Sequence, residues 1–359
     1  QTERAKFPWL VVGSALGGLA VVLGIVAFMM YRPKQPTPPV EPELSRPNPI
    51  TPTLTPKSDA DRKAAEWALG TSPNSSVEIV GQPVPITPGG RLPATPFKIR
   101  RIMIPFSYAV TDTDLNHLRE LDKLDGLQLS RTLITDMGME KLSKFPCAPR
   151  LTELSLGTEL LTDAAMQHYV AFPSLRVVSL SGPQMSSSGL VVLASKCPHL
   201  THLYLNQVKI TNFDLVPFGV LRWFWKLEHL GISCPPITAF GLGNFANWHG
   251  LKSLVLWGKG MTDAEATVVA KIPSLTTLGL HDAAITDVGL MKLAKIPGLK
   301  RLDLTSCLGV TPGGVLRFKA ALPECSIQTG AYDPRHDPER RAAEWALAKP
   351  GATISLNNT

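Results

Sequence analysis

A six-residue pattern, L-x-x-L-x-L, recurs through most of the chain and limits its fold more than any other feature. Copies begin at positions 124, 151, 175, 200, 227, 251, 275 and 299, at steps of 24 to 27 residues. The same step leads back to IRRIMI at position 99 and forward to a degraded copy around residues 322–327. Units this short cannot bury their apolar side chains alone, so they stack on their neighbours and share one core. We therefore expect a solenoid.

Each unit also has a second half, which is clearest in ITDVGLMKLAKIP at residues 285–297. The Thr and Asp that open it are typical helix N-cap residues, and Leu290, Leu293 and Ala294 have the spacing of one helix face. Pro297 would then end the helix. A period of 20 to 29 residues with this motif is typical of leucine-rich repeats. The pattern predicts an α/β leucine-rich-repeat solenoid, with a parallel sheet on its concave side and helices on its convex side.

An apolar segment precedes the repeats. Trp9 to Met30 comprises 22 residues without a charge, enough for a helix of about 33 Å across the roughly 30 Å hydrocarbon core of a bilayer. A cleavable signal peptide, the alternative, would have a shorter apolar region and a cleavage site of small residues, which residues 29–31 do not supply. Basic residues flank both ends, so the topology stays open. Gly13 and Gly17 form the G-x-x-x-G pattern through which two such helices can pair as a homodimer.

The segment that follows is rich in proline. Nine prolines stand between Pro33 and Pro56, and because proline fixes φ and removes a backbone donor, we expect an extended stalk. The predicted organisation is a juxtamembrane stub at 1–8, a transmembrane helix at 9–31, a stalk at 32–58, an N-terminal capping module at 59–96, an array of nine or ten repeats at 97–330, and a further module at 331–359.

The last of these modules repeats part of the first. DRKAAEWAL at 61–69 and ERRAAEWAL at 339–347 agree at seven of nine positions, and each is followed by a strand-like run. Ala65, Trp67 and Leu69 would give the first copy a small apolar face, able to cover the open end of a solenoid near Ile99. The second copy would close the far end of the array or open a further one.

These motifs resemble those of bacterial, planctomycete-type leucine-rich-repeat proteins and are similar to the cysteine-containing repeat subfamily. The half-repeat I-T-D-x-G-L-x-x-L carries the resemblance over residues 97–330, and the R-x-A-A-E-W-x-L block strengthens it. In some members of that family, a cytoplasmic serine/threonine kinase domain precedes the membrane helix. The resemblance therefore implies that the chain is a fragment, with any such domain upstream of Gln1.

Composition and motifs exclude several classes of function. The net charge of +7 invites a nucleic-acid partner, but many lysines fall at the solvated positions of convex helices, and we expect none. The five cysteines form no C-x-x-C pair, which excludes a zinc ribbon, and Cys197 and Cys307 fall at small core positions. No nucleotide-binding, hydrolase or kinase signature is present. We expect no cofactor and no enzymatic activity.

Candidate binding residues come from the alternation of side chains along each strand, which turns the residues between the leucines toward the concave face. The C-terminal rungs there are rich in aromatic and histidine side chains, as protein-binding hot spots are. The predicted partner-binding residues are His202, Tyr204, Asn206, His229, Trp257, His281, Asp282, Arg301 and Asp303.

Two chemical alternatives exist on this face. His202 and His229 occupy equivalent places on adjacent rungs and would suit a metal ion, but no third ligand is spaced to complete the site. His281 near Asp303 resembles a base and its orienting carboxylate, although no nucleophile accompanies them. The unit at position 200 is also irregular, because Trp223, Phe224 and Trp225 would either fill an enlarged core or form an exposed patch.

The predicted function is that of a single-pass membrane protein whose repeats bind a protein partner through the concave face. The repeat domain is expected outside the cytoplasm. One alternative is the sensor part of a transmembrane serine/threonine kinase. Another is an adaptor that recruits substrates to a ubiquitin ligase, against which the apolar anchor argues.

Overall fold

The computed structural model describes residues 58–212, 215, 226–233, 237–246, 248–258 and 260–330, within one compact unit that begins at Leu54. The predicted stub, transmembrane helix and stalk up to residue 57, the aromatic residues at 223–225 and the module at 331–359 lie outside these residues. Among the described residues, no helix has the length and apolarity needed to cross a membrane.

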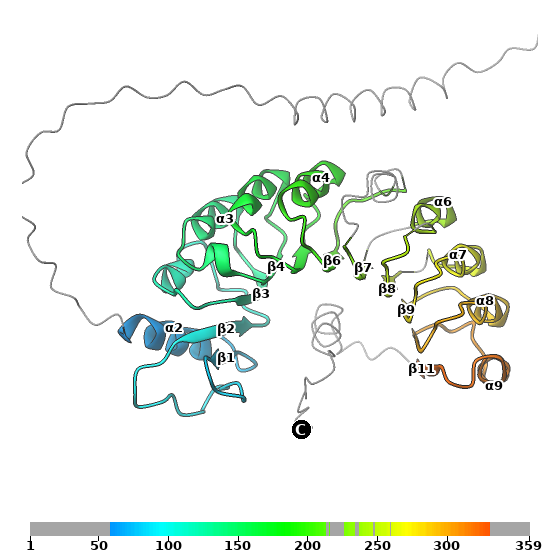
Figure 1. Cartoon of the computed structure of the whole chain (residues 1–359), viewed down its shortest axis with the longest axis horizontal. Helices are drawn as coiled ribbons and strands as arrows, with labels where there is room; N and C mark the ends of the chain where they lie inside the picture. The colour runs from blue at the N-terminus through cyan, green and yellow to red at the C-terminus, as the bar shows by residue number, and fades with distance from the viewer. Residues whose placement is uncertain are drawn as a thin grey trace, which may run out of the picture. The chain divides into compact units, whose positions relative to one another are not determined.

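The described strands form one sheet in which chain order equals spatial order (Figure 1). The first pair is antiparallel and every later pair is parallel. The strands are β1 (Ser76–Ile79), β2 (Ile99–Ile104), β3 (Gly126–Thr132), β4 (Glu153–Thr158), β5 (Val177–Ser181), β6 (His202–Asn206), β7 (His229–Ser233), β8 (Ser253–Trp257), β9 (Thr277–His281), β10 (Arg301–Thr305) and β11 (Ser326–Gly330).

Equivalent apolar residues of successive motifs stand opposite one another in this sheet. One such column, fully buried throughout, consists of Leu154, Val178, Leu203, Leu230, Leu254, Leu278 and Leu302. Burying a leucine side chain stabilises a fold by about 1.5–3 kcal/mol, so columns of this kind form the continuous core that the repeat predicts. The predicted parallel solenoid is confirmed.

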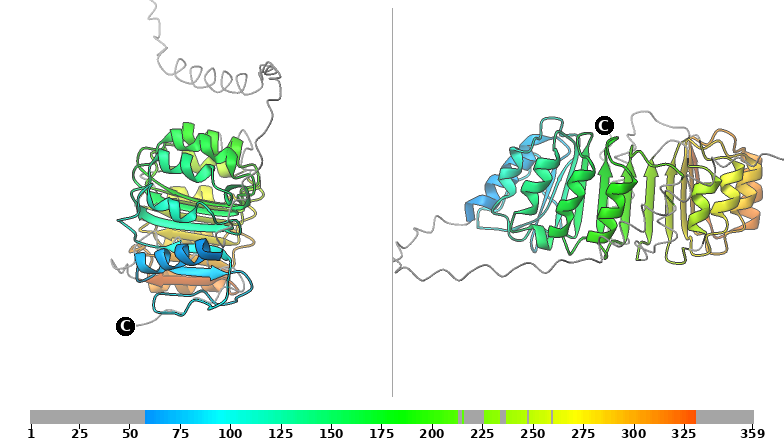
Figure 2. Two further views of the ribbon diagram at one scale, coloured as in Figure 1. Left: turned by 90° about the vertical axis from the view of Figure 1, so that its left-hand side faces the viewer. Right: turned by 90° about the horizontal axis from the view of Figure 1, so that it is seen from above.

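Helices occupy the outer, convex side of the curve, and their side-by-side stacking is plainest from above (Figure 2). These elements are η1 (Asp114–Leu118), α3 (Asp136–Ser143), η2 (Ala148–Arg150), η3 (Asp163–Ala171), α4 (Ser187–Lys196), α6 (Ala239–Leu242), η5 (Gly243–Phe245), α7 (Asp263–Val269), α8 (Asp287–Leu293) and α9 (Pro312–Ala321). Leu290 and Leu293 are buried, as predicted from their spacing. In the unit that begins at position 151, the second half is the 3-10 helix η3 rather than an α-helix.

The open N-terminal end of the core is covered by α2 (Ser58–Thr71) and by β1, which pairs with β2. Ala64, Ala65 and Ala68 of α2 are fully buried. The buried Asp61 carboxylate accepts hydrogen bonds from the Ile99 backbone N–H at 2.9 Å and from the Lys98 ammonium at 3.0 Å. This helix therefore both shields the first rung and occupies a backbone donor of its strand.

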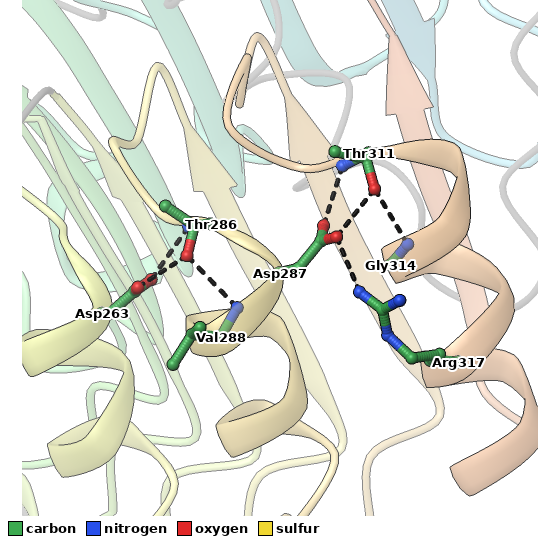
Figure 3. A network of polar contacts seen from close by, with 7 residues as sticks. All are labelled: Asp263, Thr286, Asp287, Val288, Thr311, Gly314 and Arg317. Carbon is green, nitrogen blue, oxygen red and sulfur yellow. Dashed lines mark hydrogen bonds and ion pairs between the residues drawn. The ribbon is translucent and has the colours of Figure 1, made fainter.

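In each Thr-Asp pair of this kind, the threonine caps its own helix and the aspartate contacts the next unit. The sequence analysis instead predicted that both residues cap their own helix. Thr286 is the N-cap of α8, and its hydroxyl accepts from the Val288 N–H. The Asp263 carboxylate, one unit earlier, accepts from the Thr286 N–H at 2.8 Å and from its hydroxyl at 2.7 Å (Figure 3). The same link recurs between Asp287 and Thr311. The aspartates thus join successive units.

Candidate functional site

The predicted binding residues lie on β6 to β10 in three columns along the concave face. In register, His202 stands opposite His229, Tyr204 opposite Gly231, and Trp257 opposite His281. Asp303 and the exposed Arg301 lie on β10, at the C-terminal end of the same columns. Asp282 follows β9, with a positive φ of 55°. We call His202, Tyr204, His229, Trp257, His281 and Asp303 the concave patch.

His202 and His229 are stacked face to face. Their ring centroids are 4.0 Å apart and their planes differ by 6°. Because stacked imidazoles direct their nitrogen lone pairs outward within parallel planes, they do not converge on a common point. Among the described residues, no three His, Cys, Asp or Glu side chains gather as a metal site would require. The pair is better suited to presenting a flat aromatic surface.

Tyr204 corrects the prediction of an exposed anchor, because only 2% of this residue is accessible. The reason lies on the next strand. A Cβ atom at Gly231 would lie 2.7 Å from Cδ1 of Tyr204 and 3.3 Å from Cζ3 of Trp257, so both rings lean over the glycine. Burial raises the pKa of the Tyr204 hydroxyl, which stays protonated. Tyr204 supports the floor of the concave patch, and its removal would disturb folding as well as binding.

Trp257 and His281 form a second stack, with centroids 5.3 Å apart and planes 16° apart. The Nδ1 atom of His281 lies 3.9 Å from the nearest Asp303 oxygen, beyond hydrogen-bonding distance. That oxygen instead accepts from the Thr305 N–H at 3.1 Å and from the Thr305 hydroxyl at 2.6 Å. The geometry therefore does not make Asp303 the orienting partner of a catalytic histidine.

Among the described residues, some buried polar atoms of this face lack a hydrogen-bond partner. They include the Nε1 atom of Trp257 and the hydroxyl of Ser253, both buried. Buried polar groups are paired in more than about 90% of cases, so these two atoms are exceptions, and their burial keeps them out of reach of a binding partner. The buried thiols offer no comparable chemistry, because burial raises the pKa of Cys307 to about 11 and that of Cys197 to about 12.

Asn206 belongs to a second feature, which the sequence analysis missed. A cavity of about 460 Å³ lies where strands β3 to β7 end. Its lining includes Tyr108, Arg131, Thr132, Leu133, Gly157, Thr158, Glu159, Leu160, Ser181, Asn206, Gln207 and Ser233. A register shift between Leu129 and Thr132 leaves Arg131 at a φ of 56°. The long 27-residue step from position 124 was the one sequence signal of this irregularity.

The comparison with family models agrees with the repeat assignment over one segment. The leucine-rich-repeat family model matches residues 271–294. Among solved structures, the yeast Rad7–Elc1 complex is similar with a TM-score of 0.44 and 16% identity, over 67% of this chain and 72% of that chain. Internalin C2 of Listeria monocytogenes gives 0.36 and 20%, over 75% and 92%. Internalin F of the same organism gives 0.39 and 18%, over 61% and 70%.

No curated protein matches the chain significantly. The matched repeat, together with the stacked strand-and-helix units, defines a leucine-rich-repeat protein.

Proposed function

We propose that the chain is a protein-interaction module that binds its partner through the concave patch. The observation that carries this proposal is the pair of stacked aromatic surfaces on the concave face. Flat, amphipathic rings lose little entropy on binding and supply much of the affinity at protein interfaces. A protein partner with an apolar surface fits the patch best.

The test compares Trp257→Ala with Met137→Ala in the full-length chain. Met137 is a matched control, because it lies on the convex side in α3 and is 68% exposed. A partner is identified by proximity labelling in the source cells and then purified. Trp257→Ala should weaken its binding by about 2 kcal/mol, roughly 30-fold, while Met137→Ala changes nothing. Equal affinity of both variants would refute the concave patch as the binding surface.

We also propose, from the sequence alone, that Trp9 to Met30 anchors the module in a membrane. Its support is the length of the uncharged segment and the proline-rich run behind it. Alkaline carbonate should leave the full-length chain in the membrane pellet and release a variant lacking residues 1–31. Protease added to intact cells or spheroplasts then reports the side on which the repeats lie. Their digestion supports an extracytoplasmic position, and protection contradicts it.

Two narrower roles remain proposals. The role of sensor in a bacterial transmembrane kinase is proposed from the family resemblance. The coding sequence upstream of Gln1 would test it, because it either does or does not encode a kinase domain. The ubiquitin-ligase adaptor role would require a partner from that machinery among the labelled proteins. Either role would use the same concave patch.

A further inference from the structure

The cavity at the ends of β3 to β7 is distinct from the stacked rings of the concave patch. Its floor is polar and is built from the last residues of neighbouring strands, with Ser181, Asn206 and Ser233 in register. Its mouth is apolar, because Tyr108 is 60% exposed, Leu133 49% and Leu160 39%. An apolar mouth over a small set of polar groups is the usual composition of a ligand pocket.

Asn206 is the polar group that most needs an explanation. It is 5% exposed and lines the cavity, yet its carboxamide makes no hydrogen bond to any described residue. Its side-chain nitrogen and oxygen are not among the fully buried atoms without a partner, so the carboxamide is accessible from the cavity that it lines. A carboxamide offers one acceptor and two donors, so it matches the N–H and C=O of a peptide unit.

The charges around the cavity point to a ligand of low net charge. Arg131 and Glu159 both line it, one positive and one negative. The Arg131 guanidinium lies over the rings of Phe106 and Tyr108, 5.4 and 5.7 Å from their centroids, and donates to the Tyr108 hydroxyl. This arrangement stiffens the wall of the cavity and offers no cluster of cations to a phosphate backbone.

We infer that this cavity binds an extended segment of the protein partner, with one of its peptide units on Asn206 and an adjacent bulky apolar side chain between Leu133 and Leu160. The inference rests on the proposed function only in taking the ligand from a protein. The segment's backbone supplies the hydrogen bonds that Asn206 lacks, and its side chain covers the exposed leucines. Peptide recognition of this kind divides affinity and specificity between main chain and side chain.

The first test selects a displayed library of random linear peptides on the full-length chain held in lipid nanodiscs. Selected peptides should share a Leu, Ile, Phe or Met residue. Asn206→Ala should weaken their binding about tenfold or more, whereas the matched Asn116→Ala, at an exposed position of η1, should not. Because the Asn206 carboxamide makes no hydrogen bond to a described residue, the variant should unfold at about the same temperature as wild type.

The second test places the contact on the peptide main chain. Replacing each amide of a selected peptide by an ester removes one N–H donor at a time. One ester should weaken binding to wild type about tenfold and leave binding to Asn206→Ala unchanged. An ester effect of the same size in both proteins would overturn the inference, as would a library that yields no binder.

Leu160→Ser keeps the inference testable if Asn206→Ala fails to fold, because Leu160 is already 39% exposed. It should weaken binding of the selected peptides about tenfold, and unchanged binding would refute the cavity as their site. The two proposals also fail separately. If Trp257→Ala abolishes capture of the native partner while Leu160→Ser affects neither ligand, the concave patch stands and the cavity inference falls.

Discussion

At the scale of single residues, the glycine in T-D-x-G is explained by the aspartate of the preceding unit. A Cβ atom at Gly289 would lie 2.2 Å from Oδ1 of Asp263, and one at Gly314 would lie 2.0 Å from Oδ1 of Asp287. Glycine normally weakens a helix by about 1 kcal/mol relative to alanine. Here it leaves space for a carboxylate that binds the next threonine twice. The motif is therefore a contact between units rather than a property of one helix.

Gly289→Ala should accordingly destabilise the fold by about 1–3 kcal/mol, the usual cost of forcing an atom into a filled space. Gly313→Ala is the control, because the nearest atom to its added Cβ would be 3.6 Å away. That substitution should be neutral or stabilise by up to about 1 kcal/mol. Urea unfolding followed by circular dichroism measures both. A Gly289→Ala variant more stable than wild type would show that the Asp263 side chain can move aside at little energetic cost.

The same carboxylate predicts a dependence of stability on pH. Burial raises the pKa of Asp263, but the hydrogen bonds from the Thr286 N–H and hydroxyl outweigh it, so the pKa is lowered overall. A depressed folded-state pKa stabilises the fold above the unfolded value, near 3.9, and this stabilisation is lost as the pH falls through the folded value. Asp263→Asn keeps an acceptor, as Asn212 does for Thr238.

We therefore expect wild type to lose more stability than Asp263→Asn between neutral pH and about pH 3. Urea midpoints at the two pH values give the comparison, and Asp282→Asn, which has no such link to a threonine, serves as control. Parallel losses in wild type and Asp263→Asn would show that the Asp263 link contributes nothing to acid sensitivity.

Sequence alone predicted the threonine caps, since a cap and its helix are neighbours in the chain. It could not predict the partner of each aspartate, which lies 23 residues further on in the case of Asp263 and Thr286. The burial of Tyr204 was missed for the same reason, because the glycine that makes room for its ring is on the next strand. Periodicity identifies which residues face the concave side but not how their side chains lean across it.

At the scale of elements, α2 and β1 form an end cap, and we expect its loss to destabilise only the strands next to it. A solenoid is stabilised mainly by contacts between neighbouring units, so the removal of an end cap frays the adjacent rungs first. The cap holds its rung through Asp61, which occupies the Ile99 N–H, and through the antiparallel pairing of β1 with β2. The repeated sequence motif predicted the strands of the array, but not the hydrogen bond between Asp61 and Ile99.

Asp61→Ala should leave that buried N–H unpaired, at a cost of about 1–3 kcal/mol. Hydrogen exchange should accelerate in the amides of β2 and β3 and stay unchanged in β9 and β10. Glu66→Ala, at an exposed position of the same helix, is the control. Faster exchange spread evenly over all strands would indicate that the array unfolds as a single cooperative block.

At the scale of the whole array, carboxylates reach the described N-cap threonines in one of two ways, whereas Thr238 is reached by the Asn212 amide oxygen instead. In the first arrangement, Asp263 accepts from the Thr286 N–H of the next unit, and the third helical residue of that unit is Gly289. In the second arrangement, the third residue of a helix bonds the N-cap of that same helix. The Glu265 carboxylate accepts from the Thr262 N–H in this way, and the preceding unit has Ala239 where other units have aspartate. In the first unit, Asp114 accepts from the N–H and the hydroxyl of Thr111, three residues earlier, although the N-cap of η1 is Thr113.

The two arrangements exclude each other, because both bring a carboxylate to the same threonine. Glu265 also accepts from the Ala239 N–H at 3.0 Å, so an aspartate at position 239 would meet a like charge there. Among the described residues, the link to the next unit is replaced at Ala239, whereas Asn212 still reaches Thr238 through its amide oxygen at 2.8 Å.

A double substitution tests whether the exchange is a matched pair. Ala239→Asp alone should destabilise through repulsion from Glu265, and Glu265→Gly alone should cost about 1 kcal/mol or more by uncapping Thr262. The combined variant rebuilds the arrangement of Asp263, Thr286 and Gly289, so it should recover at least about 1 kcal/mol relative to the sum of the single changes. Urea unfolding of all four proteins measures this coupling. Additive losses would mean that the two carboxylate positions are independent, and that the aspartate links do not set how one unit joins the next.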